Sequence, residues 1–113
     1  MLKAMVVDDE MLTAEHICRL LEKLDIEVLG YDTNPLEAME KAELLKPDVL
    51  FLDIEMPEMS GLELAERIHA NGGDFEIVFV TAYNQYAIQA FSVNALDYLL
   101  KPITLNDIGR SVE

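Results

Sequence analysis

Basic residues are scarce in this 113-residue chain, which has 8 Lys and Arg against 22 Asp and Glu and a formal net charge of −14 at pH 7. Binding the phosphates of a nucleic acid needs clustered Lys and Arg, so we expect no direct contact with nucleic acid. The same deficit argues against binding to an anionic membrane surface. A divalent cation or a basic protein is the more natural counterpart of this charge.

Cysteine and long apolar runs are also lacking. Cys18 is the single cysteine, so an internal disulfide is excluded, which fits a reducing cytoplasm. Apolar runs fall well short of a membrane span, and residues 1–7 are too short for the apolar core of a signal peptide. Hydrophobic residues nevertheless make up 51% of the chain, far too many for a disordered acidic tail. We therefore expect one folded, cytoplasmic domain.

Apolar strand-like runs alternate with stretches of helical periodicity. Strands are predicted at residues 3–7, 27–31, 49–52, 77–80 and 97–100. Helices are predicted to begin near Met11, at the cap-and-proline pair Asn34-Pro35, near Leu62, near Tyr86 and after the cap residue Thr104. The third and fourth strands are apolar throughout, as expected when helices cover both faces of a sheet. This alternation predicts an α/β fold, a doubly wound parallel sheet with right-handed crossovers.

Polar side chains follow four of the predicted strands at their carboxyl ends. Asp8 and Asp9 come after the first strand and Asp53 after the third, while Thr81 follows the fourth and Lys101 the fifth. In doubly wound sheets ligands bind outside these strand ends, so we expect the five side chains to converge. Three carboxylates brought together repel one another unless a cation neutralises them. Hard oxygen ligands of this kind suit Mg²⁺.

The remaining two side chains point to phosphoryl chemistry. A lysine and a hydroxyl beside Mg²⁺ supply a charge and a hydrogen bond for phosphoryl oxygens. A carboxylate can itself act as the nucleophile and form an acyl phosphate. Taken singly, Asp8 and Asp9 read as an acidic helix start and Lys101 as a surface lysine. Their joint placement favours phosphoryl transfer to an aspartate.

Four motifs, in this order and spacing, resemble the receiver domain of a two-component response regulator. They are VVDDE at 6–10, FLDIEMPEMSG at 51–61, VTAY at 80–83 and ALDYLLKP at 95–102. The resemblance covers nearly the whole chain and implies the strand order 2-1-3-4-5. The stretch TAYNQYAIQAFSVNALDYLLKPI at 81–103 further resembles receivers of the LytR/AlgR type, whose separate carboxyl-terminal domain binds DNA.

The resemblance implies a role for each acid of the site. Asp53 would be the phosphoacceptor. Asp9 and Asp53 would ligate Mg²⁺ directly, together with the backbone carbonyl of Glu55, and Asp8 would act mostly through water. Glu55 and Tyr83 match positions that border the phosphoryl group and affect its attack by water. Whether Glu55 repels or orients that water stays open.

The resemblance also implies a switch. Lys101 would pair with the phosphoryl group, Thr81 would swing toward it, and Tyr98 would turn inward as the switch aromatic. Pro102 matches a position where the family has a cis Lys–Pro bond. Phosphorylation would bias an existing two-state equilibrium.

Partners and domain limits follow from the same resemblance. The phosphodonor would be a sensor histidine kinase, and the domain would catalyse only its own phosphorylation and dephosphorylation. Dimerisation through the fourth helix, fifth strand and fifth helix is a family expectation. We interpret residues 1–113 as one receiver domain with its last helix truncated and a carboxyl-terminal effector domain missing.

Three other readings share parts of the pattern. One is an interaction module that works without phosphorylation, which the intact set of acids, Thr81 and Lys101 disfavours. A haloacid-dehalogenase-like hydrolase also uses an aspartyl phosphate, and Asp53-Ile54-Glu55 superficially mimics its paired acids. A flavodoxin-like carrier has the same topology, but its first loop cradles a phosphate, which Asp8-Asp9-Glu10 would repel.

Overall fold

The computed structural model describes residues 2–112, in which five strands form one parallel sheet. The strands are β1 (Lys3–Val7), β2 (Glu27–Asp32), β3 (Val49–Leu52), β4 (Glu76–Thr81) and β5 (Asp97–Leu100). Their order in the sheet is β2-β1-β3-β4-β5, and every neighbouring pair is parallel. The predicted fold class and strand order are therefore confirmed.

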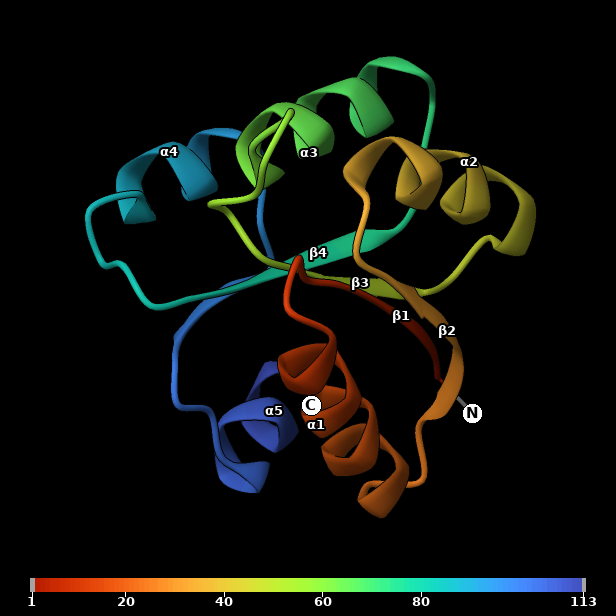
Figure 1. The fold of residues 1–113 in the computed structure, drawn as a ribbon, viewed down its shortest axis with the longest axis vertical. Helices are drawn as coiled ribbons and strands as arrows, with labels where there is room; N and C mark the ends of the chain where they lie inside the picture. Colours follow the sequence, from red (N-terminus) through yellow and green to blue (C-terminus); the bar gives the residue numbers. More distant parts are fainter. Residues whose placement is uncertain (1, 113) are drawn as a thin grey trace.

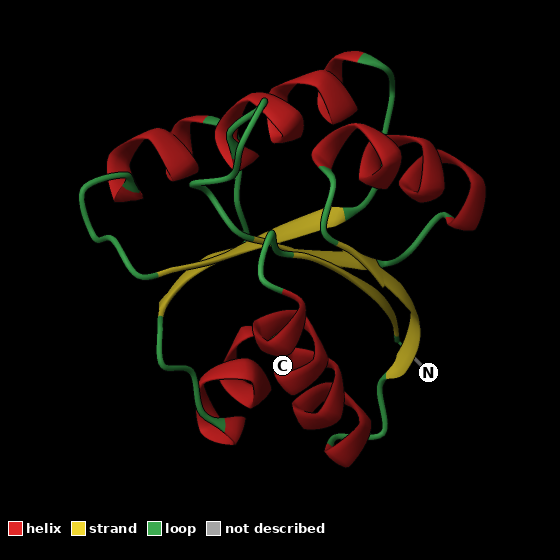
Figure 2. Ribbon diagram, viewed as in Figure 1, coloured by secondary structure: helices red, strands yellow, loops and turns green. Residues whose placement is uncertain are grey.

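Five helices cover the two faces of this sheet. They are α1 (Met11–Lys23), α2 (Pro35–Leu45), α3 (Gly61–Ala70), α4 (Ala87–Ser92) and α5 (Leu105–Ser111). Helices α1 and α5 lie on one face, and α2, α3 and α4 lie on the other (Figures 1 and 2). Within residues 2–112, the helices are all too short or too polar to cross a membrane.

The all-apolar strands are explained by two separate hydrophobic cores. In β3, Phe51 packs into the core under α1 and α5, whereas Leu50 and Leu52 pack into the core under α2, α3 and α4. Successive strand residues point to opposite faces, so a strand covered on both sides has no position left for a polar side chain. The sheet is thus anchored on both faces close to its carboxyl edge.

Strand ends differ from the prediction at two places. β2 continues to Asp32 and β4 spans Glu76–Thr81, one residue longer at each end than predicted. Pairing causes both extensions at the carboxyl end, because Asp32 aligns with Val7 and Thr81 aligns with Leu100. Thr81 is therefore the last residue of a strand rather than the first residue of a loop.

Helix starts follow the predicted caps. The side chain of Asn34 accepts hydrogen bonds from the backbone N–H groups of Leu36 and Glu37, and Thr104 forms a reciprocal capping box with Asp107. The fourth helix begins one residue later than predicted, because Tyr86 is its N-cap residue and makes no side-chain capping bond. With Ala90 as its one fully buried residue, α4 is weakly anchored.

Removing the α2 cap should lower stability by a defined amount. We expect Asn34→Ala to reduce the free energy of unfolding by about 1 kcal/mol, because two backbone N–H groups, at 2.9 and 3.1 Å from Asn34 Oδ1, lose their acceptor. Urea unfolding followed by circular dichroism measures the change. Asn71→Ala, at an exposed position where only the backbone N–H caps α3, is the matched control and should change it by less than about 0.5 kcal/mol. Equal losses in the two variants would contradict the assignment.

Candidate functional site

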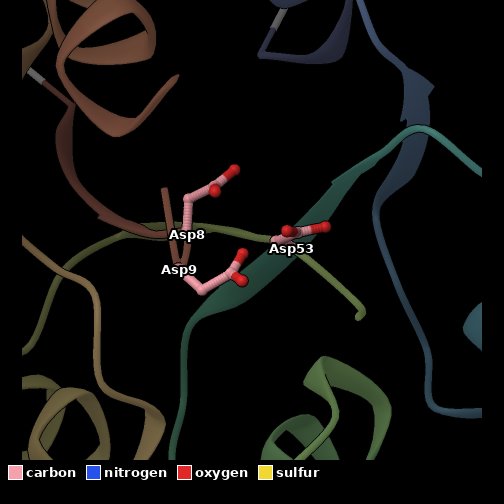
Figure 3. Close-up of side chains that lie close together, drawn as sticks. All are labelled: Asp8, Asp9 and Asp53. Carbon is pink, nitrogen blue, oxygen red and sulfur yellow. The ribbon is translucent and has the colours of Figure 1, made fainter. Parts of the chain in front are cut away.

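Three aspartates meet just beyond the carboxyl ends of β1 and β3 (Figure 3). One carboxylate oxygen from each of Asp8, Asp9 and Asp53 lies within 4.8 Å of the others. Asp8 and Asp53 are buried, whereas Asp9 is exposed. The structure therefore brings together the three acids that the sequence predicts to converge.

Backbone pairing holds the acids in place. Val7 and Leu52 are aligned neighbours at the ends of β1 and β3, and Asp53 N–H continues the ladder by donating to the Val7 carbonyl at 2.9 Å. On the other side of β1, Asp8 N–H donates to the Asp32 carbonyl at 3.1 Å. These bonds fix the backbone positions from which the Asp8 and Asp53 side chains extend.

Lys101 supplies the cation of the site. Its Nζ lies 2.8 Å from Asp8 Oδ2 and 3.5 Å from Asp53 Oδ2. The Lys101 N–H donates to the Thr81 carbonyl at 2.8 Å, and the Lys101–Pro102 peptide bond is cis, as the resemblance implied. Burial lowers the pKa of Lys101, but its ion pairs with Asp8 and Asp53 outweigh this and leave the pKa raised. The ammonium therefore stays charged.

Asp53 is the acid whose titration changes most. Burial, followed by the neighbouring charge of Asp8, raises the pKa of Asp53 from 3.8 to about 7. Lys101 and a hydrogen bond from the Ile54 N–H, 2.8 Å from Oδ1, oppose the rise without cancelling it. Ionised Asp53 is thus a high-energy group near neutral pH unless a further cation binds beside it.

The acid cluster fits a hard divalent cation. Lys101 lies at ion-pair distance from Asp8 Oδ2 but outside hydrogen-bonding geometry, so this buried oxygen has no hydrogen-bond donor among residues 2–112. Asp9 and Asp53 each offer a carboxylate oxygen beside it. Oxygen donors of this kind, few in number and partly open to water, suit Mg²⁺ better than a soft metal.

Gly61 shapes the loop that follows Asp53. Its N–H donates to the Ile54 carbonyl at 2.7 Å, which folds the loop back on itself. A Cβ at position 61 would lie 1.9 Å from the Asp53 carbonyl oxygen, a distance no side chain can occupy. This requirement for glycine was not predicted. The available signal was the position of Gly61 at the end of the motif at 51–61.

Thr81 and Tyr98 both contact the backbone of Tyr83. Thr81 is fully buried, and its Oγ1 accepts a hydrogen bond from the Tyr83 N–H at 3.3 Å. The Tyr98 hydroxyl donates to the Tyr83 carbonyl. Tyr83 thus connects the hydroxyl at the end of β4 with the aromatic ring of β5.

Glu55 makes a contact that the sequence did not predict. Its Oε2 accepts a hydrogen bond from the Tyr86 hydroxyl at 2.6 Å. The Tyr83 and Tyr86 rings stand edge to face, with centroids 6.4 Å apart. The chain carries no local signal for this bond, because its two residues are 31 positions apart.

A family model and several known proteins match this chain. The family model for the response regulator receiver domain matches residues 4–113. An uncharacterized response regulatory protein of Vibrio cholerae is 47% identical over 100% of this chain and 48% of its own length. The transcriptional regulatory protein BtsR of Escherichia coli is 47% identical over 91% of this chain and 43% of its own length. The chain thus spans about half the length of these relatives.

Solved structures show the same fold. The response regulatory domain of protein mrkE from Klebsiella pneumoniae superposes with a TM-score of 0.88 at 32% identity, covering 97% of this chain and 91% of that one. The response regulator protein TrrA from Thermotoga maritima, in complex with Mg²⁺-BeF, gives 0.87 at 32% identity, covering 99% and 96%.

The raised pKa of Asp53 predicts a pH-dependent gain in stability from Asp53→Asn. The folded pKa lies above the unfolded value, so wild-type stability is lost as pH rises from about 4 to about 7, a loss that asparagine avoids. In metal-free buffer we expect the variant to be more stable than wild type by roughly 2–4 kcal/mol at pH 8, and by less at pH 5.

Urea unfolding at the two pH values measures the difference. Asp74→Asn, at an exposed acid, is the control and should change stability little at either pH. An Asp53→Asn variant that is less stable than wild type at pH 8, or equally shifted at both pH values, would contradict the assignment.

Proposed function

Since the chain belongs to the response regulator receiver domain family, we propose that it accepts a phosphoryl group on Asp53 from a partner histidine kinase. The observation that carries this proposal is the buried Asp53 carboxylate set between two further acids and the Lys101 ammonium. Receiver domains of transcriptional response regulators are signalling switches, and in this role the chain would catalyse only its own phosphorylation and dephosphorylation.

The transfer uses side chains at the carboxyl ends of β3, β4 and β5. An Asp53 carboxylate oxygen attacks phosphorus, the P–O bond forms, and the P–N bond to the donor histidine breaks. The leaving imidazole keeps the electron pair and takes up a proton from water. Lys101, 3.5 Å from Asp53 Oδ2, pairs with the incoming phosphoryl oxygens, and the Thr81 hydroxyl donates to another of them.

Magnesium is the metal that this donor set supports. Asp9, Asp53 and the backbone carbonyl of Glu55 would hold it, with Asp8 acting through water. The bound ion would neutralise the charge that collects as a phosphoryl group joins three acids. Its presence would also keep Asp53 ionised, because a cation favours the charged form of a carboxylate.

The switch is proposed to run through Tyr83. If the Thr81 hydroxyl turns to the phosphoryl group, it stops accepting the Tyr83 N–H, and the Tyr83 carbonyl is the acceptor for Tyr98. A change at Thr81 therefore reaches Tyr98 and the segment before α4 without a change of fold. This is a population shift between two packings of one loop.

The output is proposed to lie in another part of a longer protein. The relatives are about twice as long as this chain, and one of them is called a transcriptional regulatory protein. We infer a DNA-binding output domain of the LytR/AlgR type, controlled by this domain in the cytoplasm. No observation favours the hydrolase or the flavin carrier over this function.

Phosphorylation is tested with acetyl phosphate. With Mg²⁺, intact-mass analysis should show one added phosphoryl group on the wild type and none on Asp53→Asn, because the nucleophile is gone. Chelation of Mg²⁺ should abolish the addition, and Asp74→Asn should behave as wild type. The absence of added mass on wild type, or the same addition on Asp53→Asn, would overturn the proposal.

Dimerisation is proposed to use the exposed apolar side chains of α4 and β5. Ile88 is 86% exposed, Phe91 59% and Leu100 47%, so both elements present large apolar side chains to solvent. We expect phosphorylated wild type to sediment as a dimer and phosphorylated Ile88→Arg as a monomer. Leu44→Arg, at the 82% exposed Leu44 of α2, should still dimerise. A monomeric wild type, or a dimeric Ile88→Arg, would contradict this interface.

A further inference from the structure

Glu55 is an acid that stays outside the acid cluster. It follows Asp53 by two residues, and its backbone carbonyl is a proposed metal ligand. Its carboxylate is nevertheless absent from the group of oxygens within 4.8 Å of one another, which among the described residues comes from Asp8, Asp9 and Asp53. A fourth negative charge is thus held nearby but not in the site.

The Tyr86 hydroxyl holds that carboxylate. Tyr86 Oη donates to Glu55 Oε2 at 2.6 Å, a short charge-assisted hydrogen bond. The same bond raises the pKa of Tyr86, so the phenol keeps the proton that it donates.

The Tyr86 ring is itself fixed by packing. It packs against the core under α2, α3 and α4, and the edge-to-face contact with Tyr83 has an interplanar angle of 80°. The hydroxyl is therefore presented to Glu55 by a ring that packs against both the core and Tyr83. Glu55, by contrast, is exposed.

We propose that Tyr86 is a positioning residue that keeps the Glu55 carboxylate out of the acid cluster, so that an anionic phosphodonor meets three acids there instead of four. This inference rests on the proposed function for its kinetic consequence. Its consequence for Mg²⁺ binding depends on the acid cluster alone and not on the proposed function.

Losing the hydroxyl should strengthen Mg²⁺ binding but slow phosphorylation. In Tyr86→Phe the freed carboxylate can turn toward the cluster, where it attracts Mg²⁺ and repels acetyl phosphate. We expect the Mg²⁺ dissociation constant to fall by about five-fold, and the rate constant for phosphorylation at saturating Mg²⁺ to fall by a similar factor. A general loosening of the loop would instead weaken both Mg²⁺ binding and phosphorylation.

A double-mutant cycle isolates the pair. Glu55→Gln has no charge to deliver, so adding Tyr86→Phe to it should change neither the Mg²⁺ affinity nor the phosphorylation rate. Calorimetric titration with Mg²⁺ measures the first, and intact mass over time with acetyl phosphate measures the second. Tyr31→Phe, in the opposite core, is the control for loss of a phenol hydroxyl and should match wild type.

Failure of the inference is separate from failure of the proposed function. Tyr86→Phe with unchanged Mg²⁺ affinity, with weaker Mg²⁺ binding, or with effects that persist in the Glu55→Gln background would overturn the role of Tyr86. A wild type that takes up no phosphoryl group would overturn the proposed function, while the Mg²⁺ titrations would still decide the role of Tyr86.

Discussion

Repulsion among three carboxylates at one edge of the sheet is the constraint on which the site depends. Parallel pairing of β1 and β3 aligns Val7 with Leu52, so the acids that follow them are forced together. Lys101 neutralises part of this charge, because its Nζ lies 2.8 Å from Asp8 Oδ2 and 3.5 Å from Asp53 Oδ2. Burial and the remaining repulsion raise the pKa of Asp53 to about 7, which leaves a site that gains from a second cation.

The sheet tolerates this edge because both of its faces are anchored. Phe51 and Val6 pack on one face, and Leu52 and Val7 pack on the other, all within two residues of the acids. Apolar burial at these positions is set by the two layers of helices and does not depend on what binds at the edge. An unfavourable charge cluster can therefore persist at the functional site while the rest of the fold remains locally consistent.

Both the fold and the acid cluster could be predicted from the sequence. The alternation of strands and helices follows from local periodicity, the helix caps follow from residues such as Asn34 and Thr104, and the strand order follows from the resemblance to receivers. Asp8, Asp9 and Asp53 follow from the rule that parallel strands end at one edge. The bond between Glu55 and Tyr86 could not be predicted, because it joins loops 31 residues apart and depends on the direction of two side chains. The ends of β2 and β4 were wrong by single residues, since cross-strand pairing rather than composition sets them.

Helix α4 is the element most able to respond to the site. It has six residues, one fully buried side chain and no side-chain N-cap bond, so few contacts oppose its movement. The contacts around its start involve residues of the site: Tyr86 bonds Glu55, and the Tyr83 backbone bonds Thr81 and Tyr98. A bond that differs between two arrangements of α4 must, by linkage, bias the site and be biased by it. Glu55, in the loop after β3, and Thr81, at the end of β4, therefore contact the residues just before α4 from two separate segments of the carboxyl edge.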